Sequence, residues 1–93
     1  MSREVRLSPA AQRDFDRLVD FLESKSPRAA WRAAETILAG LSSLSDRPER
    51  GRPVFGEHRE LVVRFGLDGY LVRYRVDPDA VIVASIKHIR EQC

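Results

Sequence analysis

The stretch RELVVRFGLDGYLVRYRV, residues 59–76, decides the fold predicted for this chain of 93 residues. Apolar side chains recur at every second position on both sides of GLDG, and a period of two is typical of strands that bury one face. The glycine and aspartate residues between the two runs suit a tight hairpin turn. We therefore expect two antiparallel strands that bury Leu61, Val63 and Phe65 in the first and Tyr70, Val72, Tyr74 and Val76 in the second.

A third strand is predicted in AVIVASIKH, residues 80–88, after the turn residues DPD. Its first seven residues are apolar or small on both faces, which is typical of a strand with neighbours on both sides, so we place it centrally. The segment EVRL, residues 4–7, alternates apolar and charged residues and is expected to pair beside it. Simple alternation puts His88 on the same face as Ile82, Ala84 and Ile86.

Two helices are predicted between the first strand and the hairpin. Each begins with a serine followed by a proline, at Ser8 and at Ser26. The serine side chain can cap the first turn, and proline in the first helical position loses no hydrogen bond. The connection between the helices is short, so they should form an antiparallel hairpin. Their expected core stripes are Ala11, Phe15, Leu18, Val19 and Leu22, then Trp31, Ala34, Ile37, Leu38, Leu41 and Leu44, and we place Trp31 in the core.

The segment RPERGRPVFGEH, residues 47–58, follows the second helix and is rich in arginine, proline and glycine. This composition predicts a basic connecting loop. The elements then occur in the order β-α-α-β-β-β, which predicts one α+β domain over residues 1–93. In this domain a helical hairpin packs on one face of a mainly antiparallel four-stranded sheet.

Composition restricts the classes of function. The longest apolar run is far shorter than the ~20 residues of a membrane span. The first residues, MSREVRLSP, carry charges where a signal peptide has its apolar segment, so we expect a cytoplasmic protein without membrane contact. The single cysteine, Cys93, permits no internal disulfide and no cysteine-based zinc site. We expect neither a metal nor a cofactor.

Arginine is concentrated in the second half of the chain, although the net charge is only +2. A net charge this small does not by itself indicate nucleic-acid binding. One interpretation of the arginines on the predicted strands is a solvated outer sheet face with Glu60 as an ion-pair partner. The other is a recognition surface, because the guanidinium fork suits carboxylate and phosphate groups. The residues concerned are Arg59, Arg64, Arg73 and Arg75.

Five segments, taken in order, resemble the ParE/RelE superfamily of bacterial toxins from type II toxin-antitoxin systems. They are LSPAAQRDFDRLVDFL, AAETILAGLSSLSDRPERGRP, HRELVVRFG, GYLVRYRV and VIVASIKHIRE, and the resemblance covers nearly the whole chain. It implies the α+β toxin fold and one of two activities. RelE-like members are similar to metal-free ribonucleases that cut messenger RNA in the ribosome, whereas ParE-like members poison DNA gyrase and are not nucleases.

The strand GYLVRYRV favours the ParE-like branch. RelE-like chains resemble one another in a strand Gly-Tyr-Arg-Leu-x-Tyr, whose arginine contacts the phosphate, and this chain has Leu71 in that position. Arg73 lies two residues further, about 6 to 7 Å along a strand, which is too far to take over that role unchanged. RelE-like chains also carry a tyrosine beyond the last strand that this chain does not show. The ending KHIRE is similar to ParE, whose last strand finishes in His-x-Arg, here His88 and Arg90.

The resemblance implies a toxin that inhibits DNA gyrase, blocks replication and is neutralised by a cognate ParD-like antitoxin in a hetero-oligomer. We expect a C-terminal antitoxin segment to fold on the toxin. The chain would then be a gyrase-binding protein rather than an enzyme, without catalytic residues. The expected target-binding residues are Arg59, Arg64, Arg73, Lys87, His88 and Arg90.

Alternatives remain at three points. The first alternative activity is a RelE- or YoeB-like ribosome-dependent mRNA endoribonuclease that uses His88 with a relocated arginine; the second is a non-toxic binding module. His88 is equally interpreted as a structural residue whose ring bonds a backbone carbonyl. Trp31 has an alternative as a partly exposed anchor for an antitoxin.

Overall fold

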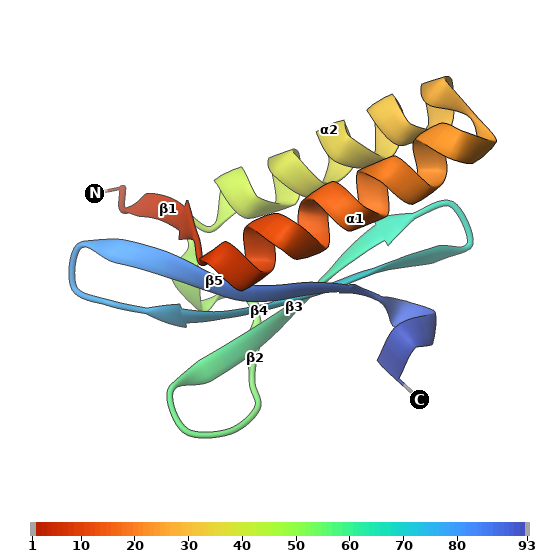
Figure 1. The fold of residues 1–93 in the computed structure, drawn as a ribbon. Coiled ribbons are helices and arrows are strands. Elements are labelled where there is room, and N and C mark those ends of the chain that lie inside the picture. Colours follow the sequence, from red (N-terminus) through yellow and green to blue (C-terminus); the bar gives the residue numbers. More distant parts are fainter. Residues whose placement is uncertain (1, 93) are drawn as a thin grey trace.

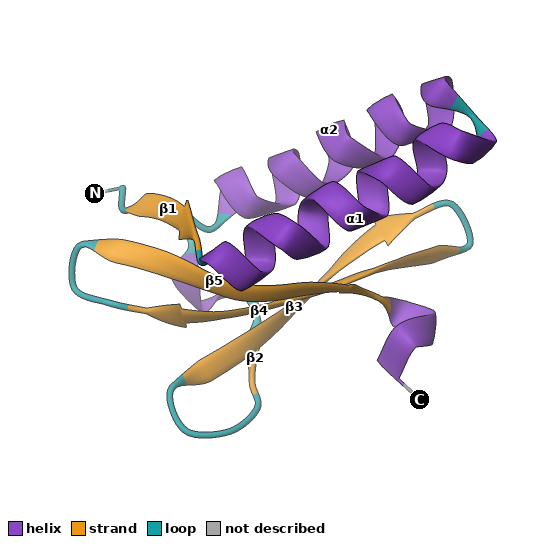
Figure 2. Ribbon diagram, in the orientation of Figure 1, coloured by secondary structure: helices purple, strands orange, loops and turns teal. Residues whose placement is uncertain are grey.

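The computed structural model describes residues 2–92, the last two by their backbone alone. Two antiparallel helices lie side by side over one face of a twisted sheet and leave its other face uncovered (Figures 1 and 2). The predicted α+β fold is confirmed. The elements are β1 (Glu4–Leu7), α1 (Pro9–Lys25), α2 (Pro27–Ser43), the 3-10 helix η1 (Pro48–Arg50), β2 (Arg52–Pro53), β3 (His58–Phe65), β4 (Asp68–Val76), β5 (Ala80–His88) and the 3-10 helix η2 (Ile89–Gln92).

The sheet contains five strands in the order β1-β5-β4-β3-β2, one more than predicted. The additional strand, β2, has only two residues, Arg52 and Pro53, and pairs with β3 inside the segment expected to be a loop. A two-residue strand that includes proline shows no alternation by which it could be recognised. β5 lies between β4 and the parallel strand β1, as its apolar run predicted.

The two serine residues cap the helices as predicted. The Ser8 hydroxyl accepts a hydrogen bond from the Ala11 N–H at 3.1 Å, and the Ser26 hydroxyl accepts one from the Ala29 N–H at 3.2 Å. Ser26 also donates its own N–H to the Leu22 carbonyl at 2.7 Å, so that it ends α1 and begins α2. A connection of one residue leaves the helices no arrangement other than an antiparallel hairpin.

The core lies between the helical hairpin and the sheet. Its sheet side includes five of the seven alternating residues predicted for the hairpin, each at most 7% exposed, whereas Phe65 and Val76 are only partly buried. α2 lies so close to β3 at Gly40 that a Cβ atom there would be only 2.7 Å from Val63 Cγ2. The predicted strand residues that are buried are Leu61, Val63, Tyr70, Val72 and Tyr74.

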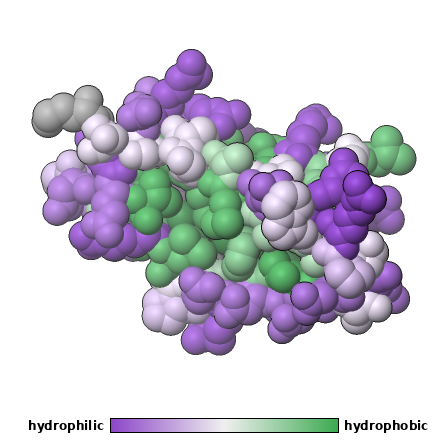
Figure 3. Space-filling model, turned by 90° about the horizontal axis from the view of Figure 1, so that it is seen from above, coloured by the Kyte–Doolittle hydropathy of each residue, from purple (hydrophilic) through white to green (hydrophobic). Residues whose placement is uncertain are grey.

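The apolar stripe predicted for α2 is wrong in part. Trp31 is 64% exposed and Leu38 is 51% exposed, so Trp31 is not a core residue. Ala30 is buried instead, and the next residue along a helix points about 100° away from it. Figure 3 shows the helical face of the molecule, where apolar side chains form a band bounded by hydrophilic ones. The buried residues of α2 are Ala30, Ala33, Ile37 and Leu41.

β5 departs from simple alternation at Ala84. The pairing register between β4 and β5 shifts there by one residue, and Ala84 has no partner on β4. An extra residue of this kind is a β-bulge, which reverses the alternation of the residues that follow. Ile82 therefore faces away from the helices while Ile86 and His88 face them. The prediction that Ile86 and His88 share one face is confirmed, whereas Ile82 lies on the opposite face.

Three further observations concern membranes, metals and the cysteine. Among the described residues, no helix is both long and apolar enough to cross a membrane. Within the same part of the chain, no three histidine, cysteine, aspartate or glutamate side chains gather as a metal ion would require. Cys93 lies outside the described residues.

Candidate functional site

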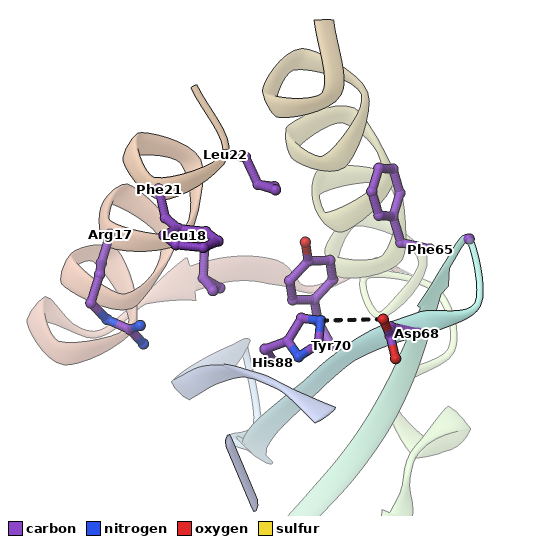
Figure 4. Close-up of a pocket in the computed structure, with 9 residues that line it drawn as sticks. Arg17, Leu18, Phe21, Leu22, Phe65, Asp68, Tyr70 and His88 are labelled. Carbon is purple, nitrogen blue, oxygen red and sulfur yellow. Dashed lines mark ion pairs between the residues drawn. The ribbon is translucent and has the colours of Figure 1, made fainter. Parts of the chain in front are cut away.

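A groove of about 660 Å³ lies between α1 and the end of the sheet at which β3 turns into β4 (Figure 4). Its walls are mainly apolar, which is typical of sites that bind ligands or peptide segments. α1 contributes Leu18, Phe21 and Leu22, and the sheet contributes Phe65 and Tyr70. These residues come from three separate segments, so the groove exists only in the folded chain.

Charged side chains form the rim of this groove. Arg17 stands on α1, while Asp68 and His88 stand on the sheet. The Asp68 carboxylate lies 3.0 Å from Arg90 Nε and 4.0 Å from His88 Nε2, and the second contact is dashed in Figure 4. The His88 ring meets the Tyr70 ring edge-on, with 5.5 Å between centroids. Asp68 thus connects the start of β4 to the C-terminal turn.

His88 has a second partner at its other ring nitrogen. Its Nδ1 accepts a hydrogen bond from the backbone N–H of Arg90 at 3.1 Å. For a purely structural His88, we expected the ring to form a hydrogen bond with a backbone carbonyl. The two contacts described here are instead with a backbone N–H group and with a carboxylate. The ring lies in the groove wall, and its side chain is 29% exposed.

The outer face of the sheet, which carries Glu60, Leu71, Arg73 and Lys87, is not covered by the helices. Glu60 is 7% exposed and accepts hydrogen bonds from Arg52 at 3.1 Å and from Arg73 at 3.0 Å. Burial raises the pKa of Glu60, but the hydrogen bonds and charges of the two arginines together lower it by more, so the pKa lies below its ordinary value. The predicted ion pair between Glu60 and a strand arginine is confirmed for Arg73.

Two of the predicted target-binding residues meet on this outer face. Arg73 and Lys87 line a depression of about 90 Å³. Leu71, which stands where RelE-like chains carry arginine, lines it as well and is paired with Lys87 in the strand register. The Arg73 guanidinium also lies over the Phe55 ring, 5.2 Å from its centroid. This part of the outer face therefore combines fixed cations with apolar surface.

Asp14 on α1 was not recognised from the sequence. Asp14 is 9% exposed, and its carboxylate accepts hydrogen bonds from the backbone N–H of Ile86 and from Lys87 Nζ, both at 3.0 Å. β1 has ended at this level of the sheet, so Asp14 replaces a neighbouring strand at the edge of β5. The available signal was its spacing, because Asp14 falls in the apolar stripe between Ala11 and Leu18.

Arg59 and Arg64, the other two strand arginines of the expected set, have different surroundings. Arg59 donates from Nη1 to the carbonyl groups of Gly51 at 2.7 Å and Glu49 at 3.3 Å, and so braces the η1 loop. Arg64 is exposed on the outer face, where the described residues offer it neither a hydrogen bond nor an ion pair. The structure therefore distributes the six expected residues over three places: Arg59 at the loop, Arg64, Arg73 and Lys87 on the outer face, and His88 and Arg90 at the groove rim.

Residues 5–93 match the family model described as the ParE toxin of the type II toxin-antitoxin system parDE. The chain belongs to this family. Toxin RelE3 of Caulobacter vibrioides is 41% identical over 90 residues, which cover 97% of this chain and 98% of that protein. Toxin RelE1 of the same bacterium is 41% identical over 92 residues, which cover 99% of each. The chain is thus a type II toxin of the ParE/RelE superfamily, with similarity to proteins named for both branches.

Two solved structures share the fold. The chromosomal ParDE toxin-antitoxin system from P. aeruginosa gives a TM-score of 0.79 at 18% identity, covering 95% of this chain and 97% of that one. The toxin-antitoxin complex RelBE2 from Mycobacterium tuberculosis gives 0.63 at 23% identity, covering 95% and 99%. At these identities the similarity establishes the fold alone.

Proposed function

We propose that this toxin inhibits DNA gyrase, and that it does so by binding rather than by catalysing a reaction. The observation that supports this proposal is the placement of Arg73 and His88 on opposite faces of the sheet. Metal-free cleavage of RNA requires a proton-transfer group and a cation at the same phosphate. A histidine under α1 and an arginine on the outer face do not meet that requirement.

The strand register explains why the two residues are separated. His88 is paired with Tyr70 on β4, and both face the helices. Arg73 is three residues beyond Tyr70, so alternation turns its side chain to the outer face, where Glu60 holds it. RelE-like chains carry an arginine at the position of Leu71. Arg73 therefore cannot act together with His88 in place of that arginine.

We propose the outer face as the surface that contacts gyrase. Arg64 and Arg73 place two cations there that the helices do not cover, and Lys87 also lines this face, although its Nζ is bound by Asp14 on α1. Arg64 forms no ion pair with the described residues, so it can bind a carboxylate without first breaking such a contact. Arginine and lysine on such a surface attract an acidic partner and orient it. His88 and Arg90 at the groove rim form a second proposed contact.

We further propose that a ParD-like antitoxin covers this chain in a cytoplasmic hetero-oligomer. Large apolar side chains that are exposed in the isolated chain support this proposal, because such surfaces mark contacts with other proteins. Trp31 is the strongest candidate anchor, since tryptophan is prominent among residues that dominate binding. The exposed apolar side chains on the helices are Phe21, Trp31 and Leu38, and Leu67 stands at the β3–β4 turn.

A ribosome-dependent ribonuclease is the second candidate. The names of the relatives from Caulobacter vibrioides favour it, as each is called a RelE toxin. His88 beside Asp68 and Tyr70 also resembles a group that could move a proton. In this alternative the reaction would take place at the groove rim without Arg73.

The test compares both targets with the same purified toxin. One reaction contains gyrase and relaxed plasmid, and the other contains translating ribosomes with a labelled messenger RNA. The proposal expects inhibited supercoiling with accumulation of cleaved plasmid, and intact messenger RNA. Messenger RNA cut on the ribosome, with gyrase unaffected, would establish the second candidate instead.

A charge reversal tests the proposed surface. Arg64→Glu should weaken gyrase inhibition by roughly tenfold, because an acidic residue would repel the acidic partner. Arg28→Glu is the matched control, because Arg28 is also exposed but lies at the start of α2, away from the outer face. Equal inhibition by both variants would exclude the outer face as the gyrase contact.

A further inference from the structure

We propose that His88 is a pH-operated switch for η2, the C-terminal turn. The neutral ring holds this turn in place, and the protonated ring releases it. The proposal rests on the contacts of the ring and is independent of which target the toxin has.

The hydrogen bond at Nδ1 determines the protonation state of the ring. A backbone N–H can only donate, so the Nδ1 atom that receives the Arg90 N–H at 3.1 Å carries no proton. The proton of the neutral ring is then on Nε2, which faces the Asp68 carboxylate at 4.0 Å. The bond from residue 90 to the side chain of residue 88 has the spacing of an Asx turn, in which a side-chain acceptor starts a turn of the backbone.

A second proton on the ring removes this bond. It would sit on Nδ1 and point at the Arg90 N–H, so two donors would face each other across a distance of 3.1 Å. Either the ring or the turn must then move. The ring is the more restrained of the two, because it packs edge-on against Tyr70, which is only 3% exposed. The backbone of the terminal turn is therefore the part that moves.

Charged groups on α1, β4, β5 and η2 lie around His88. Asp68 at the start of β4 attracts the protonated ring more strongly than the neutral one and keeps it in the groove wall. Arg17 on α1 faces the same groove, and the Arg90 guanidinium is bound to Asp68. Asp14 and Lys87 are joined to each other at the edge of β5. The contact between Arg90 and Asp68 persists through a long, largely exposed side chain and limits how far the turn moves once the ring has released it.

Histidine is the side chain that changes charge between about pH 8 and pH 5. The turn follows directly on a residue of the groove wall, so its release changes the boundary of the groove in that interval. A partner that enters the groove would meet an ordered turn at pH 8 and a mobile one at pH 5.

Nuclear magnetic resonance on the isotope-labelled full chain tests the switch. Between pH 8 and pH 5 we expect the Arg90 amide signal to move and the heteronuclear NOE of residues 89–92 to fall. Both changes should share one midpoint with the titration of the His88 ring. If the ring titrates while the Arg90 amide and the NOE values stay constant, the switch does not exist.

Two variants assign the effect to one nitrogen atom. His88→Asn places an amide oxygen near the position of Nδ1, where it can accept the Arg90 N–H but cannot gain a proton in this range. This variant should keep the NOE values high at both pH values. His58→Asn, which alters the other histidine, should retain the transition. A transition that persists in His88→Asn, or disappears in His58→Asn, would overturn the proposal.

Discussion

The two ends of β4 hold their side chains very differently. At one end Asp68 lies between His88 and Arg90 beside the open groove, and its side chain is 36% exposed. Further along the strand Arg73 binds Glu60, which is 7% exposed and is also bound by Arg52. Each carboxylate has two partners among the basic side chains. Their burial differs, and burial rather than the number of partners determines how much an ion pair matters to stability.

The Arg73 end is strengthened further by a tyrosine. The Tyr74 hydroxyl donates to the Pro48 carbonyl and accepts from the Gly51 N–H, both at 2.7 Å. Gly51 is required at this point, because a Cβ atom there would lie 2.6 Å from the Tyr74 hydroxyl. The η1 loop is therefore fixed to the strand. Among the described residues, no tyrosine fixes a loop to the strand at the Asp68 end, and we call the two the locked end and the open end.

The largest effect is expected for Tyr74→Phe at the locked end. Loss of the hydroxyl leaves a buried N–H and a buried carbonyl without partners, which should lower the free energy of unfolding by about 3 kcal/mol. Tyr70→Phe is the matched control at the open end, where the described residues give the Tyr70 hydroxyl no hydrogen bond. It should cost less than about 0.5 kcal/mol. Urea unfolding at pH 7 measures both, and equal losses would abolish the distinction between the ends.

Glu60→Gln should have the next largest effect. The substitution removes the charge that two arginines share in a nearly buried site, and we expect a loss of about 2 kcal/mol. Glu57→Gln is the control, because Glu57 is exposed three residues before Glu60, in the connection between β2 and β3. If Glu60→Gln is as stable as the Glu57→Gln control, the charge of Glu60 contributes nothing to the stability of the fold.

The pH dependence of stability sharpens this prediction. The pKa of Glu60 is lower in the folded chain than its ordinary value of 4.5. Its ion pairs therefore stabilise the fold above about pH 4.5, and this contribution is lost as the pH falls through the folded-state pKa. The difference in unfolding free energy between the native chain and Glu60→Gln should shrink between pH 6 and pH 3. A difference that stays constant over this interval contradicts the assignment.

The smallest effect is expected for Asp68→Asn at the open end. Its ion pairs are exposed and screened, so the free energy of unfolding should fall by less than about 0.5 kcal/mol. The terminal turn should nevertheless exchange its amide hydrogens faster. Asp77→Asn, which breaks the exposed pair with Arg75, is the control and should leave exchange in the turn unchanged. A loss above about 2 kcal/mol would show that the open end is as tightly built as the locked end.

Much of this fold was predictable from local patterns. The alternating hairpin and the two serine caps were correct because they depend on neighbouring residues alone. Three features could not be predicted in this way, because packing between distant segments decides each of them. They are the short strand β2, the exposure of Trp31 and the bulge at Ala84. A one-residue rotation of α2 is enough to exchange Trp31 for Ala30.

The candidate site was predictable only in part. The pairing of Glu60 with a strand arginine followed from alternation, since residues on one sheet face are neighbours. The groove could not be foreseen, as its walls come from α1, β3 and β4. Asp68 was interpreted as a turn residue, and its sequence position does not reveal that β5 brings His88 and η2 against it. The division of the expected cations between two sheet faces also requires the strand register.

The most direct test of gyrase inhibition is to induce this chain alone in growing bacteria and to pulse-label DNA and protein synthesis in parallel over the first minutes. Gyrase inhibition predicts early loss of thymidine incorporation while methionine incorporation continues. Early loss of methionine incorporation, with DNA synthesis unaffected, would contradict it and assign the toxin to the ribosome.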